Sequence, residues 1–332
     1  MEEKDQLEQR TIATMSLAES PAQLCVAGTG AWGRCIGALL ARLGHHVTLW
    51  SPTGRDLTPL CEAAHDFPGK LLAATTLEEA ARGARAVIVA VSSPHVREVA
   101  RALQALTPRL VVVLTKGLEA GTGLRLSEVI RAELPQTEVC VLSGGSHAEE
   151  VALGMPFAVA AAAKRLETAR EVKAWFVGSE ARIEETTDLL GVELCAVLKN
   201  VIAIGAGIAD GLALGDNFRG ALISRGMTEL SVLLTRAGGN PATLMGPAGL
   251  GDLLATALSP HSRNRRFGLA VGRGLSMEAA LQEVGAVVEG VNALEACIAM
   301  EAQLGLALRF PLVLRAILRG ERAAAEIKHV ID

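Results

Sequence analysis

The fold is decided close to the N-terminus, by the stretch Leu24-Cys25-Val26-Ala27-Gly28-Thr29-Gly30-Ala31-Trp32-Gly33. A short apolar run ends at Gly28, and a helical pattern then extends from Ala31 to Leu43. The spacing GxGxxG at such a strand-to-helix turn is typical of dinucleotide-binding sites. Gly28 would permit the tight turn, Gly30 would let a pyrophosphate approach the backbone, and Gly33 would let the helix pack on the strand. The alternative interpretation is a glycine-rich turn that holds no ligand.

Apolar runs of strand length recur along the first half of the chain. They lie at His46–Trp50, Ala86–Val91, Leu110–Thr115 and Val139–Ser143. Helical patterns separate them, for instance Pro94–Leu106 and Leu124–Glu133. Because the runs are continuous rather than alternating, they indicate a parallel sheet that is covered on both faces. The alternation of strand and helix predicts a doubly wound α/β domain of the Rossmann type.

The pattern changes after Gly191, where strand-like runs almost vanish. Long stretches rich in Ala and Leu take over, at Val192–Ala209, Phe218–Ala237, Met277–Val284 and Asn292–Leu304. We therefore expect a flexible polar extension over residues 1–20 and a dinucleotide-binding domain over residues 21–190. A mostly α-helical C-terminal domain for substrate binding and catalysis would follow over residues 191–332.

Composition excludes several classes of protein. The 332 residues are 50% hydrophobic and carry a formal net charge of -4, which argues against a dedicated nucleic-acid binder. The first twenty residues lack a basic start followed by an apolar stretch, so they are no secretory signal. Glu193, Lys199 and Asn200 interrupt the longest apolar run, so we expect no membrane span and a cytoplasmic location. The six cysteines have neither CxxC nor zinc-ligand spacing, which indicates buried thiols and no metal.

The end of the second predicted strand bears on the choice of cofactor. It reads Trp50-Ser51-Pro52-Thr53-Gly54-Arg55, without the acid that commonly binds the adenosine ribose. No carboxylate there repels a 2′-phosphate, and Arg55 is close by in the sequence. We therefore expect NADP(H) or NAD(H) as cofactor, with NADP(H) slightly favoured. Asp56 is either a displaced ribose ligand or an ordinary surface residue.

Two lysines are candidates for catalysis. Lys199 lies inside the apolar stretch Leu194–Ile202, where a charged side chain pays a desolvation cost unless it has a partner or a task. Burial and a neighbouring cation would lower its pKa and suit it to general acid–base work. Lys116 follows a predicted strand, at the sheet edge where ligands bind. The alternatives are a lysine on a solvated helix face and an ordinary loop lysine.

Three further motifs carry polar groups that could hold an anion. The turn Ser143-Gly144-Gly145-Ser146-His147-Ala148 follows a strand, and its small residues would let a ligand reach the backbone or simply form a turn before a helix capped by Ser146. The loop Gly249-Leu250-Gly251-Asp252 carries one acid. In Ser262-Arg263-Asn264, the planar fork of Arg263 suits a phosphate, although a solvated basic helix start is the alternative. Glu289 is either a site residue or a salt-bridge partner.

Together, these ordered motifs resemble the bacterial-type NAD(P)-dependent glycerol-3-phosphate dehydrogenases, from about Leu24 to Gly290. The most specific pieces are Lys116-Gly117-Leu118-Glu119, Gly191-Val192-Glu193-Leu194, Leu198-Lys199-Asn200-Val201 and Gly207-Ile208-Ala209-Asp210-Gly211-Leu212. The resemblance implies hydride transfer between NAD(P)H and C2 of dihydroxyacetone phosphate, giving sn-glycerol 3-phosphate for phospholipid synthesis. It also implies a homodimer.

The resemblance implies a role for each motif residue. Lys199 would be the general acid/base on the C2 oxygen. The substrate would be held by Lys116, Gly144, Ser146, Lys199, Asp252, Ser262, Arg263 and Asn264. The cofactor would be held by Gly28, Gly30, Ala31, Trp32, Gly33, Lys116, Ala148, Arg263, Val287 and Glu289.

The chain departs from the family pattern at a few positions. Gly145 stands where the family typically has proline, His147 where it has an aromatic residue, and Glu149 where it has a basic one. These changes bear on substrate affinity rather than on the type of reaction. Two other functions fit the same two-domain plan. One is a dehydrogenase for a β-hydroxyacid or ketopantoate, and the other is an NADPH-binding sensor without catalytic activity.

Overall fold

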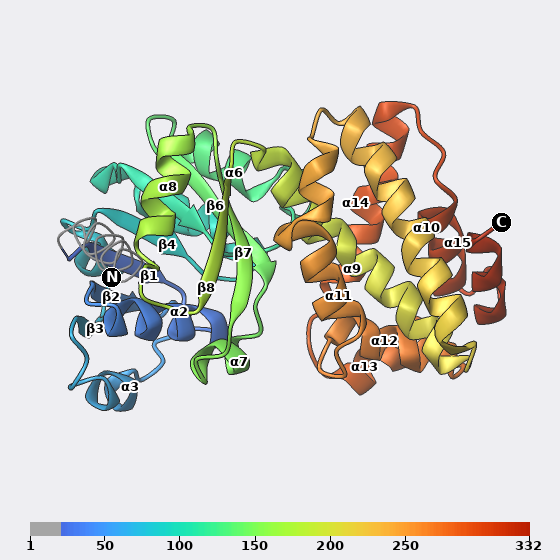
Figure 1. Cartoon of the computed structure of the whole chain (residues 1–332), viewed down its shortest axis with the longest axis horizontal. Coiled ribbons are helices and arrows are strands. Elements are labelled where there is room, and N and C mark those ends of the chain that lie inside the picture. Colours follow the sequence, from blue (N-terminus) through green and yellow to red (C-terminus); the bar gives the residue numbers. More distant parts are fainter. Residues whose placement is uncertain (1–20) are drawn as a thin grey trace, which may run out of the picture.

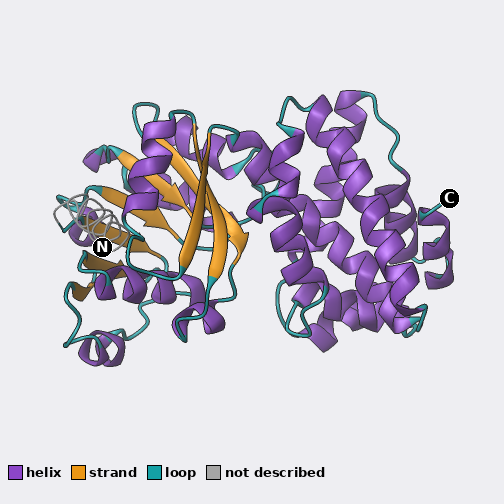
Figure 2. Cartoon of the chain, viewed as in Figure 1, coloured by secondary structure: helices purple, strands orange, loops and turns teal. Residues whose placement is uncertain are grey.

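The computed structural model describes residues 21–332, and the predicted extension over 1–20 lies outside these residues. One eight-stranded sheet organises the N-terminal half of the chain, and the C-terminal half consists of helices (Figures 1 and 2). The expected fold class, a Rossmann-type doubly wound domain followed by a mostly helical domain, is confirmed.

The sheet has the strand order β3-β2-β1-β4-β5-β6-β7-β8. The strands are β1 (Gln23–Ala27), β2 (His46–Trp50), β3 (Lys70–Ala74), β4 (Ala86–Val89), β5 (Leu110–Val113), β6 (Glu138–Gly145), β7 (Phe157–Ala163) and β8 (Ala181–Thr186). Neighbouring strands run parallel except β6 and β7, which are antiparallel. The strand order reverses at β1, beside β4, so the carboxyl ends of these strands form the crevice where a doubly wound sheet binds its ligand.

The central strands are apolar on both faces because helices cover both sides of the sheet. Leu24 and Val26 of β1 pack into one core with α2 (Ala31–Arg42) and α8 (Leu166–Ala174). Their neighbours Cys25 and Ala27 pack into the opposite core with α4 (Leu77–Ala81), α5 (Val96–Ala102) and α6 (Leu126–Glu133). This double burial is the physical reason for the continuous apolar runs.

Strands β3, β7 and β8 were not predicted. β3 and β8 lie at the two edges of the sheet, and Leu72 on β3 is 53% exposed. β7 contains mainly alanine, which favours helices in isolation, and only its pairing with β6 and β8 makes it a strand.

The helical half is assembled around α9 (Leu189–Gly211), which begins three residues after β8 ends. Around it lie α10 (Gly215–Arg236), α11 (Asp252–Ala257), α12 (Arg263–Gly272), α13 (Met277–Val284), α14 (Glu289–Leu304) and α15 (Arg309–Leu318). By length and composition α9 could cross a membrane, and it is the one helix of residues 21–332 that could. However, 94% of its most apolar window is buried inside the protein, as expected for a core helix.

Glycines bring α9 and α12 into backbone contact. A Cβ atom on Gly207 of α9 would lie 2.1 Å from the carbonyl oxygen of Arg265, and one on Gly268 of α12 would lie 2.1 Å from that of Ile204. No side chain fits at either point. The start of α12, with Arg263 and Asn264, is therefore held at a fixed place along α9.

We expect Gly207→Ala to lower the free energy of unfolding by about 1–3 kcal/mol, because the new methyl group must push α12 away. Gly220→Ala is the matched control, since Gly220 is exposed within α10 and a Cβ atom there meets nothing within 4 Å. That change should be neutral or stabilise by up to about 1 kcal/mol through helix propensity. Urea titration measures both, and equal effects of the two variants would contradict the close packing.

Candidate active site

The turn between β1 and α2 is shaped to receive a pyrophosphate. Gly28 has a φ of +115°, and a Cβ atom there would lie 2.5 Å from the carbonyl carbon of Ala90. A Cβ atom on Gly33 would lie 2.0 Å from the oxygen of Gly28, so both positions need glycine. A Cβ atom on Gly30 would meet nothing within 4 Å. No side chain caps the N-terminus of α2. Open space therefore faces the free N–H groups of this helix start, as an anion requires.

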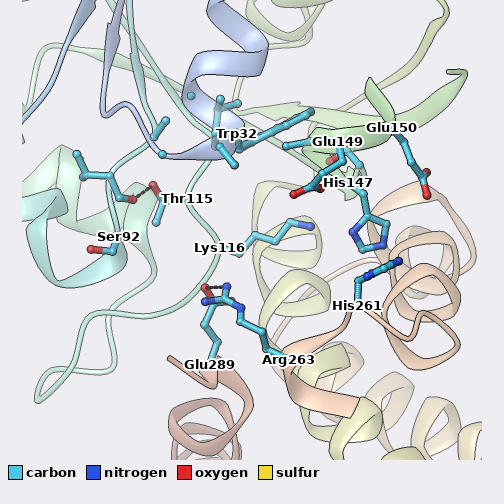
Figure 3. Close-up of a pocket in the computed structure, with 18 residues that line it drawn as sticks. Trp32, Ser92, Thr115, Lys116, His147, Glu149, Glu150, His261, Arg263 and Glu289 are labelled. Carbon is cyan, nitrogen blue, oxygen red and sulfur yellow. Dashed lines mark hydrogen bonds and ion pairs between the residues drawn. The ribbon is translucent and has the colours of Figure 1, made fainter. Parts of the chain in front are cut away.

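This turn opens into a cleft of about 860 Å³ that both halves of the chain line (Figure 3). The predicted site residues on its wall are Gly30, Ala31, Trp32, Gly33, Lys116, Ser146, Ala148, Arg263 and Glu289. Arg263 and Glu289 come from the starts of α12 and α14, and the others come from the sheet domain. The cleft therefore joins the nucleotide turn to the helical half of the chain.

A single carboxylate joins the two candidate lysines. Lys116 Nζ donates to Asp252 Oδ2 at 2.7 Å and to the carbonyl oxygen of Gly144 at 2.9 Å. Lys199 Nζ donates to Asp252 Oδ1 at 2.5 Å and to Thr256 Oγ1 at 2.6 Å. Lys116 lines the cleft. Lys199 is 5% exposed and does not line it, and Asp252 connects the two lysines. The structure thus brings together lysines from the sheet and from α9.

The electrostatics of this cluster favour a readily titrated amine on Lys199. Burial and, after it, the ammonium of Lys116 lower the pKa of Lys199 to about 8, although Asp252 and Glu289 act in the opposite direction. Burial alone would raise the pKa of Asp252, but Lys116 and Lys199 outweigh it and hold this pKa below its usual value. At neutral pH, two cations therefore share one anion in a buried place.

Other predicted residues do not line the cleft. The Ser262 hydroxyl caps α12 by accepting from Arg265 N at 3.3 Å. The Asn264 amide donates to Asn200 Oδ1 at 2.9 Å, and its oxygen accepts from Gly290 N at 2.9 Å. Gly28 lies within the nucleotide turn and packs against Ala90, Gly144 offers its backbone oxygen to Lys116, and Val287 is 69% exposed.

Several residues that line the cleft were not predicted. They are Ala90, Val91, Ser92, Leu114, Thr115, His147, Glu149, Glu150 and His261. The first five continue from β4 and β5, and the rule that ligands bind beyond the carboxyl ends of strands could have found them. His147 is held toward the helical half by a 3.2 Å hydrogen bond between its Nε2 and the carbonyl oxygen of Ala255. No sequence signal indicates that contact.

Residues 21–332 contain no group of three or more His, Cys, Asp or Glu side chains that could hold a metal ion. The six cysteines are free, and all except Cys61 are buried.

The fold and this cleft are those of a nicotinamide-dependent oxidoreductase. Models of the N-terminus and the C-terminus of NAD-dependent glycerol-3-phosphate dehydrogenase match residues 23–169 and 188–328. The chain is 42% identical over 279 residues to the glycerol-3-phosphate dehydrogenase (NAD(P)+) of Thermoanaerobacter sp. (strain X514), covering 81% of this chain and 84% of that relative. It therefore belongs to the NAD-dependent glycerol-3-phosphate dehydrogenase family.

Two solved structures share the fold of this chain. The glycerol-3-phosphate dehydrogenase of Coxiella burnetii is 33% identical, with a TM-score of 0.84 over 94% of this chain and 98% of that one. A ketopantoate reductase from Ralstonia eutropha JMP134 is 20% identical, with a TM-score of 0.57 over 92% of this chain and 99% of that one. The second likeness extends to the fold alone.

Proposed function

We propose that the chain interconverts dihydroxyacetone phosphate and sn-glycerol 3-phosphate with NAD(P)H, and that Lys199 is the general acid and base. One observation carries the proposal: Lys199 and Lys116 share the buried carboxylate of Asp252 at the inner wall of a cleft that starts at the nucleotide turn. Family membership supplies the substrate, and this cluster supplies the proton chemistry.

Lys199 has the geometry and the charge that proton transfer needs. An ammonium has three donors, and two of them bind Asp252 and Thr256, so one remains for the C2 oxygen of the substrate. A pKa of about 8 keeps the amine protonated near neutrality while leaving the proton easy to transfer. In the reverse direction, the neutral amine accepts the proton of the C2 hydroxyl.

The residues of the nucleotide turn fit a dinucleotide. The N–H groups at the start of α2 would take the pyrophosphate, and the open space at Gly30 would admit it. When bound, NAD(P)H supplies the hydride to the C2 carbon. Trp32, Ala148 and Glu289 line the same cleft and would flank the cofactor.

Cations at the cleft would hold the phosphate of the substrate. Arg263 is about half exposed and lies at the start of α12, where N–H groups and the helix dipole add to its charge. Its Nη2 lies 3.9 Å from Glu289 Oε1, which leaves donors of the guanidinium free to bind a phosphate. We assign Ser146, Ser262 and Asn264 to the same substrate site, Ser262 and Asn264 through the helix start that they fix.

We further propose that NADP(H) is the preferred cofactor. Arg55 Nη1 donates to the carbonyl oxygen of Thr29 at 3.4 Å, which supports its place beside the nucleotide turn. Asp56 accepts from the backbone of Thr58 at 2.9 Å, a bond that lowers the pKa of this carboxyl. Asp56 is therefore engaged at the start of α3 (Thr58–Ala63), which leaves the Arg55 charge available for a 2′-phosphate.

The organisation of the protein completes the proposal. We propose a division into a dinucleotide-binding domain over residues 21–190 and a substrate domain over 191–332, which the end of β8 and the start of α9 support. A homodimer in the cytoplasm is proposed on the family resemblance. The product would feed phospholipid synthesis.

The test of the activity is NADPH oxidation with a panel of ketones. We expect turnover with dihydroxyacetone phosphate, and rates at least about a hundredfold lower with ketopantoate and β-ketoacids, which lack the phosphate that Arg263 recognises. Absorbance of the nicotinamide measures both. Faster turnover of ketopantoate, or cofactor binding without any turnover, would refute the proposal.

Lys199→Ala should lower turnover about 10²–10⁴-fold while cofactor affinity stays within a few-fold, because only the proton transfer is lost. Lys164→Ala, a change at an exposed lysine, is the matched control. In the wild type, kcat/KM for ketone reduction should fall as pH rises through about 8, since the ammonium is the active form. For alcohol oxidation it should rise through the same pH. If kcat/KM changed with pH in the same sense for ketone reduction and for alcohol oxidation, Lys199 would not be the general acid and base.

Arg55→Ala should raise the KM for NADPH about tenfold, which corresponds to the loss of one charge-assisted hydrogen bond of about 1.4 kcal/mol. The KM for NADH should stay within about twofold, because NADH has no 2′-phosphate. Arg82→Ala, which removes an exposed arginine of another loop, serves as control. Equal effects on both cofactors would show that Arg55 does not read the 2′-phosphate.

A further inference from the structure

A second charged residue, Glu193, is buried in the first turns of α9. Glu193 Oε1 accepts from the backbone N–H of Ser127 at 2.8 Å. Its Oε2 accepts from Ser127 Oγ at 2.6 Å and from Arg125 Nη1 at 2.9 Å. Three donors, all from the sheet domain, thus converge on one carboxylate of the helical domain.

These contacts cap another helix. Ser127 is the second residue of α6, so its N–H is one of the orphan donors at a helix start, and Glu193 satisfies it from outside the helix. Burial raises the pKa of Glu193, and the bonds to Ser127 and the charge of Arg125 oppose that effect. Removing the carboxylate would leave buried donors without a partner, which is costly.

The same contacts hold the loop that carries Lys116. Leu118 and Arg125 form an antiparallel bridge, and Glu119 N donates to the carbonyl oxygen of Leu124 at 2.9 Å, so the two ends of the loop lie together. Fixing Arg125 therefore fixes Leu118, two residues from Lys116. On its other side the loop is held by Arg97, whose Nε donates to Glu119 Oε1 at 2.6 Å.

We propose that Glu193 is a positioning residue that holds the Lys116 loop against α9, and so sets Lys116 and Lys199 at the distance that lets both bind Asp252. Glu193 and Lys199 are six residues apart, which is about 9 Å along the helix and a rotation of about 120°. One side of α9 is thereby tied to the sheet domain while another side presents the catalytic amine. The inference rests on the proposed function, since Lys199 must be the proton donor.

The chain offers a closely matched control. Glu229 on α10 is as buried as Glu193, accepts from Phe310 N at the second residue of α15 at 2.8 Å, and pairs with Arg225 at 2.8 Å. It caps a helix in the same way, yet it touches neither the Lys116 loop nor the cleft. If Glu193 only stabilised the fold, Glu193→Gln and Glu229→Gln should have the same effects.

We expect Glu193→Gln to lower kcat for dihydroxyacetone phosphate about 10- to 100-fold, because small misplacements of a reacting group cost this much. The Kd for NADPH should stay within about twofold. Glu229→Gln should lose a similar amount of thermal stability and keep kcat within about twofold.

The pH profile separates positioning from a merely structural role. Around Lys199, Lys116 lowers the pKa of the amine, while Asp252 and Glu289 raise it. Displacement of Lys116 should therefore move the alkaline limb of kcat/KM for reduction to higher pH. Loss of the Glu193 charge itself would act in the opposite direction, so an upward shift reports the displacement of Lys116.

The comparison of the two variants decides whether Glu193 positions the Lys116 loop. The inference is overturned if Glu193→Gln matches Glu229→Gln in kcat and in pH profile. If Glu193→Gln does not fold, Ser127→Ala removes one donor to the same carboxylate, and a loss in kcat of about threefold with the same upward shift supports the inference, while an unchanged profile overturns it. A wild-type enzyme without turnover would overturn the proposed function and this inference together.

Discussion

The carboxylate of Asp252 is the interaction on which the rest of the site depends. It is almost fully buried, where a lone anion would be strongly destabilised, and it is kept ionised by two ammonium groups. Because each of its oxygens binds a different lysine, it fixes the position of Lys116 relative to Lys199. Lys116, Lys199 and Asp252 together carry one excess positive charge in a buried region of low dielectric. That excess, together with burial, lowers the pKa of the Lys199 amine.

The fold delivers these three groups from three separate elements with little freedom of movement. Lys116 follows β5, whose carboxyl end is fixed by the sheet, and Asp252 begins α11. Lys199 is carried by α9, which is buried on all sides and meets α12 with backbone against backbone. Rigid elements place a side chain more accurately than loops do. The accurate placement of Lys199 and Asp252 therefore follows from the packing of the helical half, whereas Lys116 depends on the contacts that hold its loop.

The sequence allowed the central strands, the glycine turn after β1 and the unusual burial of Lys199 to be predicted, because each has a local cause. Double burial produces the apolar runs, a close backbone approach demands Gly28 and Gly33, and desolvation makes a lysine in an apolar helix conspicuous. The rest depends on distant contacts. β7 is a strand only because of its neighbours, and the pairing of Lys116 with Asp252 joins positions 136 residues apart. The use of the Asn264 amide between Asn200 and Gly290 is likewise invisible in one sequence.

The composition of α9 shows how a core helix can be both apolar and specific. Up to Ala209 its charged side chains are Glu193 and Lys199, and its hydropathy is that of a membrane helix. Apolar contacts are non-directional, so a uniformly apolar helix could slide or rotate among similar neighbours at small cost. A buried charge has low energy only where its partner lies. Glu193 meets its donors in the sheet domain and Lys199 meets Asp252, so the two charges together define the height and the rotation of the helix. The residues that cost the most to bury thus specify where the Lys199 amine lies.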